Sequence, residues 1–278
     1  MPTIATFNLC NFGADASPTR LARLGAIIAR ELEGPDILAV QEVKGASPAL
    51  AEVRVPADPA YRALIAAIAQ ADGPRYAFRE IPPLAHQDGG MAGANIRIGL
   101  LFNPATVHFP DRGDAGPEDS VGIRLDGGQP SLTLNPGRIA PAHPMRSTTR
   151  REGDYAKKQR HAQAEIVHRF AADLLACDPR AAIVLLGDLN DVPGSKTLKL
   201  LKGEAFHNLL EDLPCGQAYT RRHGSQPQAL DHILVSPALR HGAAARIPHL
   251  NSNAAPGEPE PASDHDPVVA ALPALLGG

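Results

Sequence analysis

The sequence predicts an α/β fold in which buried strands form a sandwich with helices on its outer faces. Short apolar segments of strand length alternate along the chain with longer segments whose apolar residues recur at helical spacing. Several of the strand-like segments are short and mostly apolar, and Ile183–Leu186 is wholly so, which is typical of strands covered on both faces. With 278 residues and 44% hydrophobic content, the chain is long enough to bury a core as one domain without structural disulfides.

The first hundred residues contain the clearest predicted elements. Thr3–Leu9 is expected to be a buried strand. Ser17 then has the residue type and position of a helix N-cap, Pro18 follows it in the first turn, and Gly34 ends the helix. The further elements expected here are strands at Ile37–Val40, Tyr76–Ile81 and Ile96–Phe102 and a helix from Asp58 to about Gly73.

Residues 104–158 are predicted to be a long irregular region, because Pro, Gly and Asp dominate them. Only Val121–Leu125 and Ser131–Leu134 resemble strands, and irregular stretches of this length in compact domains are typically functional loops or disordered. Regular structure is expected to return at Gln159 with an amphipathic helix that extends to Leu175. The strands expected after this helix are Ile183–Leu186, Ile233–Val235 and Val268–Leu272.

The overall charge and the cysteines argue against several classes of protein. A net charge of −3 and a pI near 6.4 lack the basic excess that usually marks nucleic-acid binding. A basic run between Arg146 and Arg160 is either a local substrate-binding surface or a solvated loop. Widely spaced cysteines without a CxxC motif argue against a disulfide framework and against a zinc site.

The chain shows no segment that would direct it into or across a membrane. It begins with a strand-like segment rather than with a basic and then apolar leader, and no apolar run reaches the roughly 18 residues of a spanning helix. We therefore expect a cytoplasmic protein, or a secreted one if a leader has been removed. Neither contact with a membrane nor an obligate protein partner is predicted.

Polar side chains gather next to the ends of the predicted strands. They are Asn8, Glu42, Asp188, Asn190, Asp231, Asp264 and His265. Because strand ends meet on one rim of a sheet, carboxylates and amides at these positions would form an oxygen-rich site. Oxygen ligands suit Mg²⁺, Mn²⁺ or Ca²⁺ better than zinc. Taken singly, each residue is equally well explained as a turn, a cap or a solvated side chain. Their joint occurrence favours a site.

A series of short motifs, taken together and in order, resembles the endonuclease/exonuclease/phosphatase superfamily, which includes the deoxyribonuclease-I-like nucleases. The motifs are Thr6–Leu9 (TFNL), Val40–Val43 (VQEV), Ile98–Phe102 (IGLLF), Leu186–Asp191 (LGDLND), Leu230–Ser236 (LDHILVS) and Ser263–Val268 (SDHDPV). Each motif is weak by itself, whereas the ordered set spans nearly the whole chain. The final motif is typical of the bacterial predicted-nuclease branch of the superfamily.

The resemblance implies a four-layer α/β sandwich formed by the whole chain, residues 1–278, as a single domain. It also implies a divalent-metal-dependent phosphodiester hydrolase, with Mg²⁺ or Mn²⁺ as the expected cofactor and Ca²⁺ as an alternative. Glu42 would bind the metal ion, with Asn8 nearby and Asp264 contributing. Lys44 and Asn11 are expected to contact the substrate, a nucleic acid or another phosphoester.

The resemblance further implies how the reaction is catalysed. Asp188 would position or deprotonate the attacking water, and Asn190 would hold a phosphate oxygen. His265, oriented by Asp231, would stabilise the charge of the transition state. These roles make chemical sense, because a carboxylate within hydrogen-bond reach activates water and a histidine paired with an aspartate is favoured as imidazolium.

The resemblance breaks at one place. The superfamily normally has a strand ending in Asn-x-His before the helix that leads to Asp188, and residues 140–159 contain neither an apolar strand nor this motif. Arg160–Gln163 already matches the beginning of that helix, and His143 is the sole histidine in the interval. The sequence therefore predicts a sheet without one central strand and an impaired activity, because the residues of a catalytic site act together.

Three functions remain open on the sequence alone. A metal-dependent nuclease is preferred. A phosphatase or phospholipase-type hydrolase of a small phosphorylated substrate is the alternative that the weak net charge favours. A non-catalytic descendant that binds metal or phosphate is the alternative that the missing Asn-x-His motif favours.

Overall fold

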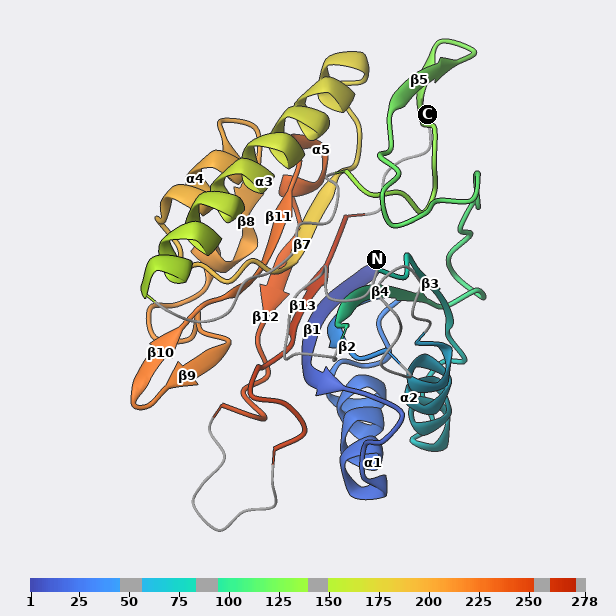
Figure 1. The fold of residues 1–278 in the computed structure, drawn as a ribbon, viewed down its shortest axis with the longest axis vertical. Coiled ribbons are helices and arrows are strands. Elements are labelled where there is room, and N and C mark those ends of the chain that lie inside the picture. Colours follow the sequence, from blue (N-terminus) through green and yellow to red (C-terminus); the bar gives the residue numbers. More distant parts are fainter. Residues whose placement is uncertain (46–56, 84–94, 140–149, 253–260, 274–278) are drawn as a thin grey trace.

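The computed structural model of the protein describes residues 1–45, 57–83, 95–139, 150–252 and 261–273. Two β-sheets lie next to each other, and helices cover the outer face of each sheet (Figure 1). The predicted α/β class is confirmed, and so are the four layers that the resemblance implied.

The first sheet has six strands in the order β12-β13-β1-β2-β4-β3. The central strands β1 and β2 are parallel, and the other neighbouring strands are antiparallel. The strands are β1 (Thr3–Phe12), β2 (Ile37–Val43), β3 (Ala77–Glu80), β4 (Arg97–Phe102), β12 (Ala244–Arg246) and β13 (Val268–Ala271). β1 and β2 are buried over most of their length, because other layers cover both faces of the sheet.

The second sheet is smaller, with the antiparallel order β7-β11-β8. Its strands are β7 (Val184–Asp188), β8 (His207–Asn208) and β11 (Asp231–Val235). β11 is buried throughout, whereas most of β7 is only half-buried. Within the described ranges, no strand pairs with the second edge of β7. Two hairpins lie outside both sheets: β5 (Ile123–Asp126) with β6 (Gln129–Leu132), and β9 (Arg221–His223) with β10 (Gln226–Gln228).

Helices α1 and α2 cover the first sheet, and helices α3 and α4 cover the second (Figure 1). The helices are α1 (Pro18–Ala26), η1 (Ile27–Glu31, a π-helix), α2 (Asp58–Gln70), α3 (Arg150–Cys177), α4 (Lys196–Lys202), η2 (Leu209–Asp212, a 3₁₀-helix) and α5 (Pro237–Arg240). As predicted, Ser17 caps α1, because its side chain accepts a hydrogen bond from the N–H of Arg20. Among the described helices, none combines the length and the apolar character needed to cross a bilayer.

Three apolar clusters fill the spaces between the four layers. Phe7 and Leu64 lie in the cluster between the first sheet and its helices. Ile233 and Val268 lie in the cluster between the two sheets, and Leu234 lies in the cluster under α3 and α4. The neighbours Ile233 and Leu234 belong to different clusters because successive side chains of a strand point to opposite faces. Because of this alternation, β11 contributes side chains to two apolar clusters, one on each face of its sheet.

The two central strands shift register near their ends. The pairing of β1 with β2 is irregular between Asn8 and Phe12, and the pairing of β2 with β4 is irregular before Val43. Glu42 lies in the shifted segment with a left-handed φ of 57°. Because of the shift, Phe12 and Val43 both return to the core beneath the helices, whereas Glu42 turns away from it.

The structure corrects two expectations for the middle of the chain. The helix before β7 begins at Arg150 rather than at Gln159, because its first turns are polar and therefore show no apolar spacing. Residues 104–158 are also not irregular throughout, since β5 and β6 form a regular antiparallel hairpin. The hairpin coincides with the two strand-like stretches noted in this region.

The structure also bears on the strand that the sequence lacks. β6 ends at Leu132, residues 133–139 form only isolated bridges, with Arg112 and Ser120 as partners, and α3 begins at Arg150. Thus no described residue of this interval joins the second sheet, which agrees with the predicted loss of a strand beside β7. His143 lies outside the described residues.

Candidate active site

The polar residues predicted from the strand ends meet where the two sheets face each other. Asn8 comes from β1, Glu42 from β2, Asp188 from the end of β7 and Asp231 from the start of β11. Asp188 and Asp231 lie directly opposite each other in the β7–β11 pair. The site therefore bridges the sandwich, and its geometry depends on the packing of one sheet against the other.

The side-chain amide of Asn8 joins the two halves of the site. Its Nδ2 donates to Glu42 Oε1 at 3.1 Å and to Asp188 Oδ2 at 2.9 Å. Its Oδ1 accepts a hydrogen bond from the N–H of Cys10 at 2.9 Å. Only 1% of Asn8 is exposed, so these internal bonds replace water as its partners. Asn8 thereby holds carboxylates from opposite sheets close together.

Residues with a left-handed backbone conformation orient the polar groups on the first sheet. Cys10 and Asn11 have φ values of 49° and 51°, as Glu42 does at 57°. The N–H of Asn11 donates to Glu42 Oε2 at 3.0 Å, so the turn in β1 fixes the second oxygen of this carboxylate. Left-handed non-glycine residues cost on the order of 1–3 kcal/mol each and are often found at functional sites.

Both carboxylate oxygens of Asp188 accept hydrogen bonds. The backbone N–H of Asn190 donates to Oδ1 at 2.8 Å, and the Asn190 amide donates to Oδ2 at 3.2 Å. Burial and then the negative charge of Asp231 raise the pKa of Asp188 above its ordinary value, while His265 opposes this rise. A carboxylate with a raised pKa is a stronger base toward water near neutral pH.

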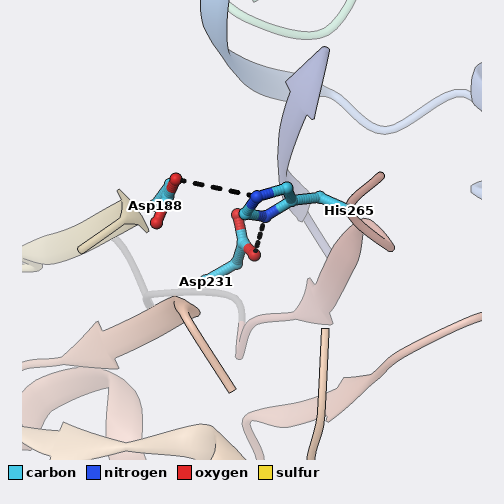
Figure 2. Close-up of side chains that lie close together, drawn as sticks. All are labelled: Asp188, Asp231 and His265. Atoms are coloured by element: carbon cyan, nitrogen blue, oxygen red, sulfur yellow. Dashed lines mark hydrogen bonds and ion pairs between the residues drawn. The ribbon is translucent and has the colours of Figure 1, made fainter. Parts of the chain in front are cut away.

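His265 lies between the two aspartates, with one ring nitrogen toward each (Figure 2). Its Nδ1 is 2.7 Å from Asp231 Oδ2, and its Nε2 is 4.0 Å from Asp188 Oδ2. Burial lowers the pKa of His265, but the hydrogen bond and charge of Asp231, together with the other carboxylates, raise it to about 9. The ring is therefore an imidazolium at neutral pH and places positive charge beside Asp188.

Asp264 lies on the rim of the site. Its Oδ1 is 4.0 Å from His265 Nε2, and its Oδ2 is 2.6 Å from Arg221 Nη2. The thiol of Cys10 is hydrogen-bonded to Asp264, and burial, followed by this carboxylate, raises the pKa of Cys10 to about 11. The predicted metal ligand is thus near the site, with an arginine as its ion-pair partner.

The two predicted substrate contacts lie on the part of the rim formed by β1 and β2. Lys44 Nζ is 3.0 Å from Asp15 Oδ2, and the backbone N–H of Lys44 donates to the carbonyl of Phe12. The side-chain oxygen of Asn11 is buried and has no hydrogen-bond partner among the described atoms. Lys44 lies two residues after Glu42, and Asn11 is hydrogen-bonded to it through its backbone N–H. The contact of both residues with a substrate remains a prediction.

Two further residues support the site, although no role was predicted for them from the sequence. The Nδ1 of His232 accepts a hydrogen bond from the side-chain amide of Asn208 at 3.1 Å, and its Nε2 donates to the carbonyl oxygen of Asp191 at 3.0 Å. Because Asp191 follows the Asp188 loop, buried His232 braces that loop from beneath. Arg221 reaches Asp264 from a short hairpin. His232 lies within the motif Leu230–Ser236 and could have been singled out for that reason, whereas no sequence pattern distinguishes Arg221.

The carboxylates fit a hard divalent cation. Asp188, Asp231 and His265 place one ligand-type atom each within 4.8 Å of one another. Asp231 and His265 already bond to each other, so we interpret this group as a hydrogen-bonded pair beside a base rather than as the metal site. The oxygens of Glu42, which the amide of Asn8 and the backbone N–H of Asn11 hold in place, are the harder donors and fit Mg²⁺ or Mn²⁺ better.

This fold and this arrangement of residues define a phosphoesterase-like protein, and the family comparison agrees. The model of the endonuclease/exonuclease/phosphatase family matches residues 5–265, and the chain belongs to this family. The comparison with curated proteins finds no match.

Solved structures of similar fold cover 98% of this chain. Truncated TDP2 from Caenorhabditis elegans is 16% identical, with a TM-score of 0.55 over 96% of its chain. A family member from Bacteroides vulgatus is 16% identical, with a TM-score of 0.56 over 98% of its chain. The mannosyl-6-phosphatase Bt3783 from Bacteroides thetaiotaomicron is 15% identical, with a TM-score of 0.55 over 99% of its chain. At these identities the similarity establishes the fold.

Proposed function

We propose that the protein hydrolyses phosphodiesters with the help of a divalent metal ion and that its substrate is a nucleic acid. One observation carries this proposal: a connected group of buried and half-buried side chains bridges the sheets. Its members are Asp231, His265, Asp188, Asn8 and Glu42. Membership in a family of phosphoester hydrolases supports the reaction class.

Residues of the first sheet would hold the metal ion, and a residue that follows β7 of the second sheet would hold the phosphate. A bound Mg²⁺ or Mn²⁺ neutralises charge on a phosphate and orients it for attack. Glu42 would be the principal protein ligand, with Asn8 fixing its position and Asp264 contributing from the rim. The exposed amide of Asn190, beside Asp188, would hold a phosphate oxygen.

Asp188 and Asp231 of the second sheet, together with His265 from the segment before β13, would carry the proton transfer and the charge. Asp188 would take a proton from the attacking water as the new bond from oxygen to phosphorus forms. The bond from phosphorus to the leaving oxygen then breaks, and that oxygen takes up a proton from solvent. The imidazolium of His265, held by Asp231, would stabilise the negative charge that accumulates on phosphorus-bound oxygens.

A hydrolase of a small phosphorylated substrate is the second candidate. One structure of similar fold, at a TM-score of 0.55, is a mannosyl-6-phosphatase, so the fold is compatible with a small phosphorylated substrate. The net charge of −3 also favours a small substrate over a polyanion. A non-catalytic metal- or phosphate-binding protein is the third candidate, since no described strand occupies the second edge of β7.

A substrate panel tests the proposal. Turnover is measured with Mg²⁺ or Mn²⁺ on bis-p-nitrophenyl phosphate, p-nitrophenyl phosphate, plasmid DNA, single-stranded DNA, RNA and inositol phosphates. We expect hydrolysis of the diester and of nucleic acid, loss of activity in EDTA and recovery on adding the metal. Asp188→Ala should lower the rate about 10²–10⁴-fold, the usual contribution of a general base.

The other outcomes separate the candidates. Faster turnover of the monoester than of the diester would favour the phosphatase. Calorimetric binding of Mg²⁺ or Mn²⁺ without turnover of any panel member would favour the non-catalytic protein. Because the Asn-x-His strand is missing, we expect rates below those of a complete family member assayed in parallel. Equal rates that vanish in Asp188→Ala would contradict an impaired site.

A further inference from the structure

We infer that Arg221 binds a phosphate of the substrate next to the one that is hydrolysed, which makes a polynucleotide the preferred substrate. The inference rests on the proposed function, because it takes the surroundings of His265 as the place of hydrolysis. Arg221 lies in β9, outside every motif that carries the resemblance to the family.

Backbone hydrogen bonds attach β9 to the segment that contains His265. Arg221 forms a backbone bridge with His265, and the N–H of Asp266 donates to the carbonyl of Thr220 at 2.6 Å. The hydroxyl oxygen of Thr220 accepts a hydrogen bond from the N–H of Asp231 at 3.2 Å. The beginning of β9 is thus bonded next to both members of the His–Asp pair, so the position of Arg221 relative to the site is fixed.

A stack of side chains holds the same hairpin from the other side. The guanidinium carbon of Arg222 lies 4.7 Å from the centre of the Tyr219 ring, and this ring stacks on His249 with 4.0 Å between centroids. His249 Nδ1 is in turn 3.2 Å from Asp266 Oδ2. Successive side chains of a strand point to opposite faces, so Arg222 serves the stack while Arg221 faces the site.

The distances place the guanidinium of Arg221 beyond the reacting centre. Arg221 Nη2 is 2.6 Å from Asp264 Oδ2, and the other oxygen of Asp264 is 4.0 Å from His265 Nε2. The carboxylate of Asp264 therefore lies between the guanidinium of Arg221 and the ring of His265. At this separation, Arg221 would contact the phosphate next to the one that is bound at His265.

The Arg221–Asp264 pair is open to an incoming anion. Its side chains are 37% and 42% exposed, and ion pairs with such exposure are weak. An arginine has five N–H donors in a planar fork that suits phosphate oxygens. A substrate phosphate can thus replace or share the carboxylate partner without an uncompensated buried charge.

The charge around Arg221 also fits a polyanion. Residues 213–230 contain no aspartate or glutamate but include Arg221, Arg222 and His223, whereas the chain as a whole has a net charge of −3. The hairpin is therefore a local positive surface beside a phosphate-binding site. Such surfaces attract the backbone of nucleic acids in a salt-dependent manner.

The test compares a substrate with one phosphate and a substrate with many. Values of kcat/KM are measured for bis-p-nitrophenyl phosphate and for a fluorescein-labelled single-stranded oligonucleotide. In Arg221→Ala we expect the oligonucleotide value to fall at least tenfold more than the value for the small diester, mainly through KM. Arg221→Lys, which keeps the charge but loses the fork, should lie between wild type and Arg221→Ala. In Arg221→Ala, the slope of log kcat/KM for the oligonucleotide against the logarithm of the salt concentration should become less negative by about 1.

Arg124→Ala is the matched control. Arg124 Nη2 forms a similar exposed pair, 2.9 Å from Asp126 Oδ2, in the other hairpin. Its removal should leave the ratio of the two kcat/KM values at the wild-type level. Melting temperatures within a few degrees of wild type would show that the variants are folded, and Arg221→Lys provides a second variant if Arg221→Ala is not.

Failure of the inference and failure of the proposed function give different results. Equal losses on both substrates in Arg221→Ala would overturn the inference. So would a wild-type protein that hydrolyses the small diester but neither cleaves nor binds the oligonucleotide. If the wild type hydrolyses nothing, the proposed function fails. Fluorescence anisotropy of the labelled oligonucleotide with Mg²⁺ then tests whether Arg221 contributes to binding. Weaker binding by Arg221→Ala but not by Arg124→Ala would support the role of Arg221, and equal binding would refute it.

Discussion

The two sheets contribute to the site from unlike surroundings. Asn8 and Glu42 come from β1 and β2, which have partners on both edges and are buried in the middle of a six-stranded sheet. Asp188 comes from β7, which has one described partner and is mostly half-buried. The proposed metal ligands therefore sit in the more protected half of the molecule and the proposed base in the more exposed half. Metal binding and catalysis should consequently respond differently to mutation.

The largest expected effect separates these two halves by chemistry. Asp188→Asn should lower kcat about 10³-fold at every metal concentration, since an amide cannot accept the proton of water. Glu42→Gln should instead raise the concentration of Mg²⁺ or Mn²⁺ that gives half-maximal activity. Metal titrations of bis-p-nitrophenyl phosphate turnover measure both effects. Recovery of Asp188→Asn at high metal concentration would show that both residues serve the ion.

The second prediction compares the cores under the two sheets. Leu101 in β4 is fully buried, whereas Leu185 in β7 is only half-buried. Leu101→Ala should lower the free energy of unfolding by about 3 kcal/mol, because it removes a buried side chain and leaves a cavity. Leu185→Ala should lower it by roughly 1 kcal/mol, since less apolar surface is lost from the core. Urea unfolding measures the two values, and equal losses would contradict the comparison.

The third prediction concerns the pH dependence of the His–Asp pair, which joins His265, before β13 of the first sheet, to Asp231 of the second sheet. The folded pKa of His265 is raised from 6.5 to about 9, so its contribution to stability is complete below 6.5 and is lost as the pH rises through about 9. The loss is on the order of 3 kcal/mol for the metal-free protein. Urea unfolding in EDTA between pH 6 and about pH 10 measures it. Asp231→Asn should remove most of this dependence, and an unchanged slope in that variant would assign it to another group.

The smallest expected effect concerns the helix caps, for which the two halves of the molecule should respond alike to mutation. Ser17 caps α1 on the first sheet, and Ser195 caps α4 on the second, each by accepting a hydrogen bond from a backbone N–H. Ser17→Ala and Ser195→Ala should each cost about 1 kcal/mol of stability, because capping is local. Thermal unfolding of both variants measures this. Clearly unequal losses would show that the contrast between the sheets extends to their helices.

Much of the fold was predictable because its signals are local. Most residues of the strands β1, β2 and β4 are apolar, and the cap at Ser17 depends on a few neighbouring residues. The convergence of Asn8, Glu42, Asp188 and Asp231 followed from their positions at strand ends, since ends of neighbouring strands share a rim. The polar first turns of α3 lacked such a signal and were missed.

The remaining features depend on partners that are distant in sequence. The register shift that turns Glu42 into the site arises from pairing with β1 and β4, and nothing in the residues around it predicts a bulge. Arg221 acquires its role only because β9 lies beside His265. The ion pair that ties Asp264 to Arg221 is likewise a product of tertiary contact. Which residues come together was thus more predictable from the sequence than the contacts that arrange them.

The register shifts in β1 and β2 have a consequence for exchanging segments between this protein and its relatives. On either side of the shift, the side chains that face the helices follow opposite parity in the numbering, as Phe7 and Phe12 show. A chimera that joins a strand lacking the shift before Phe12 would place that ring on the wrong face of the sheet. Crossovers are therefore best placed in the connections outside β1 and β2, so that both strands are inherited together as one unit.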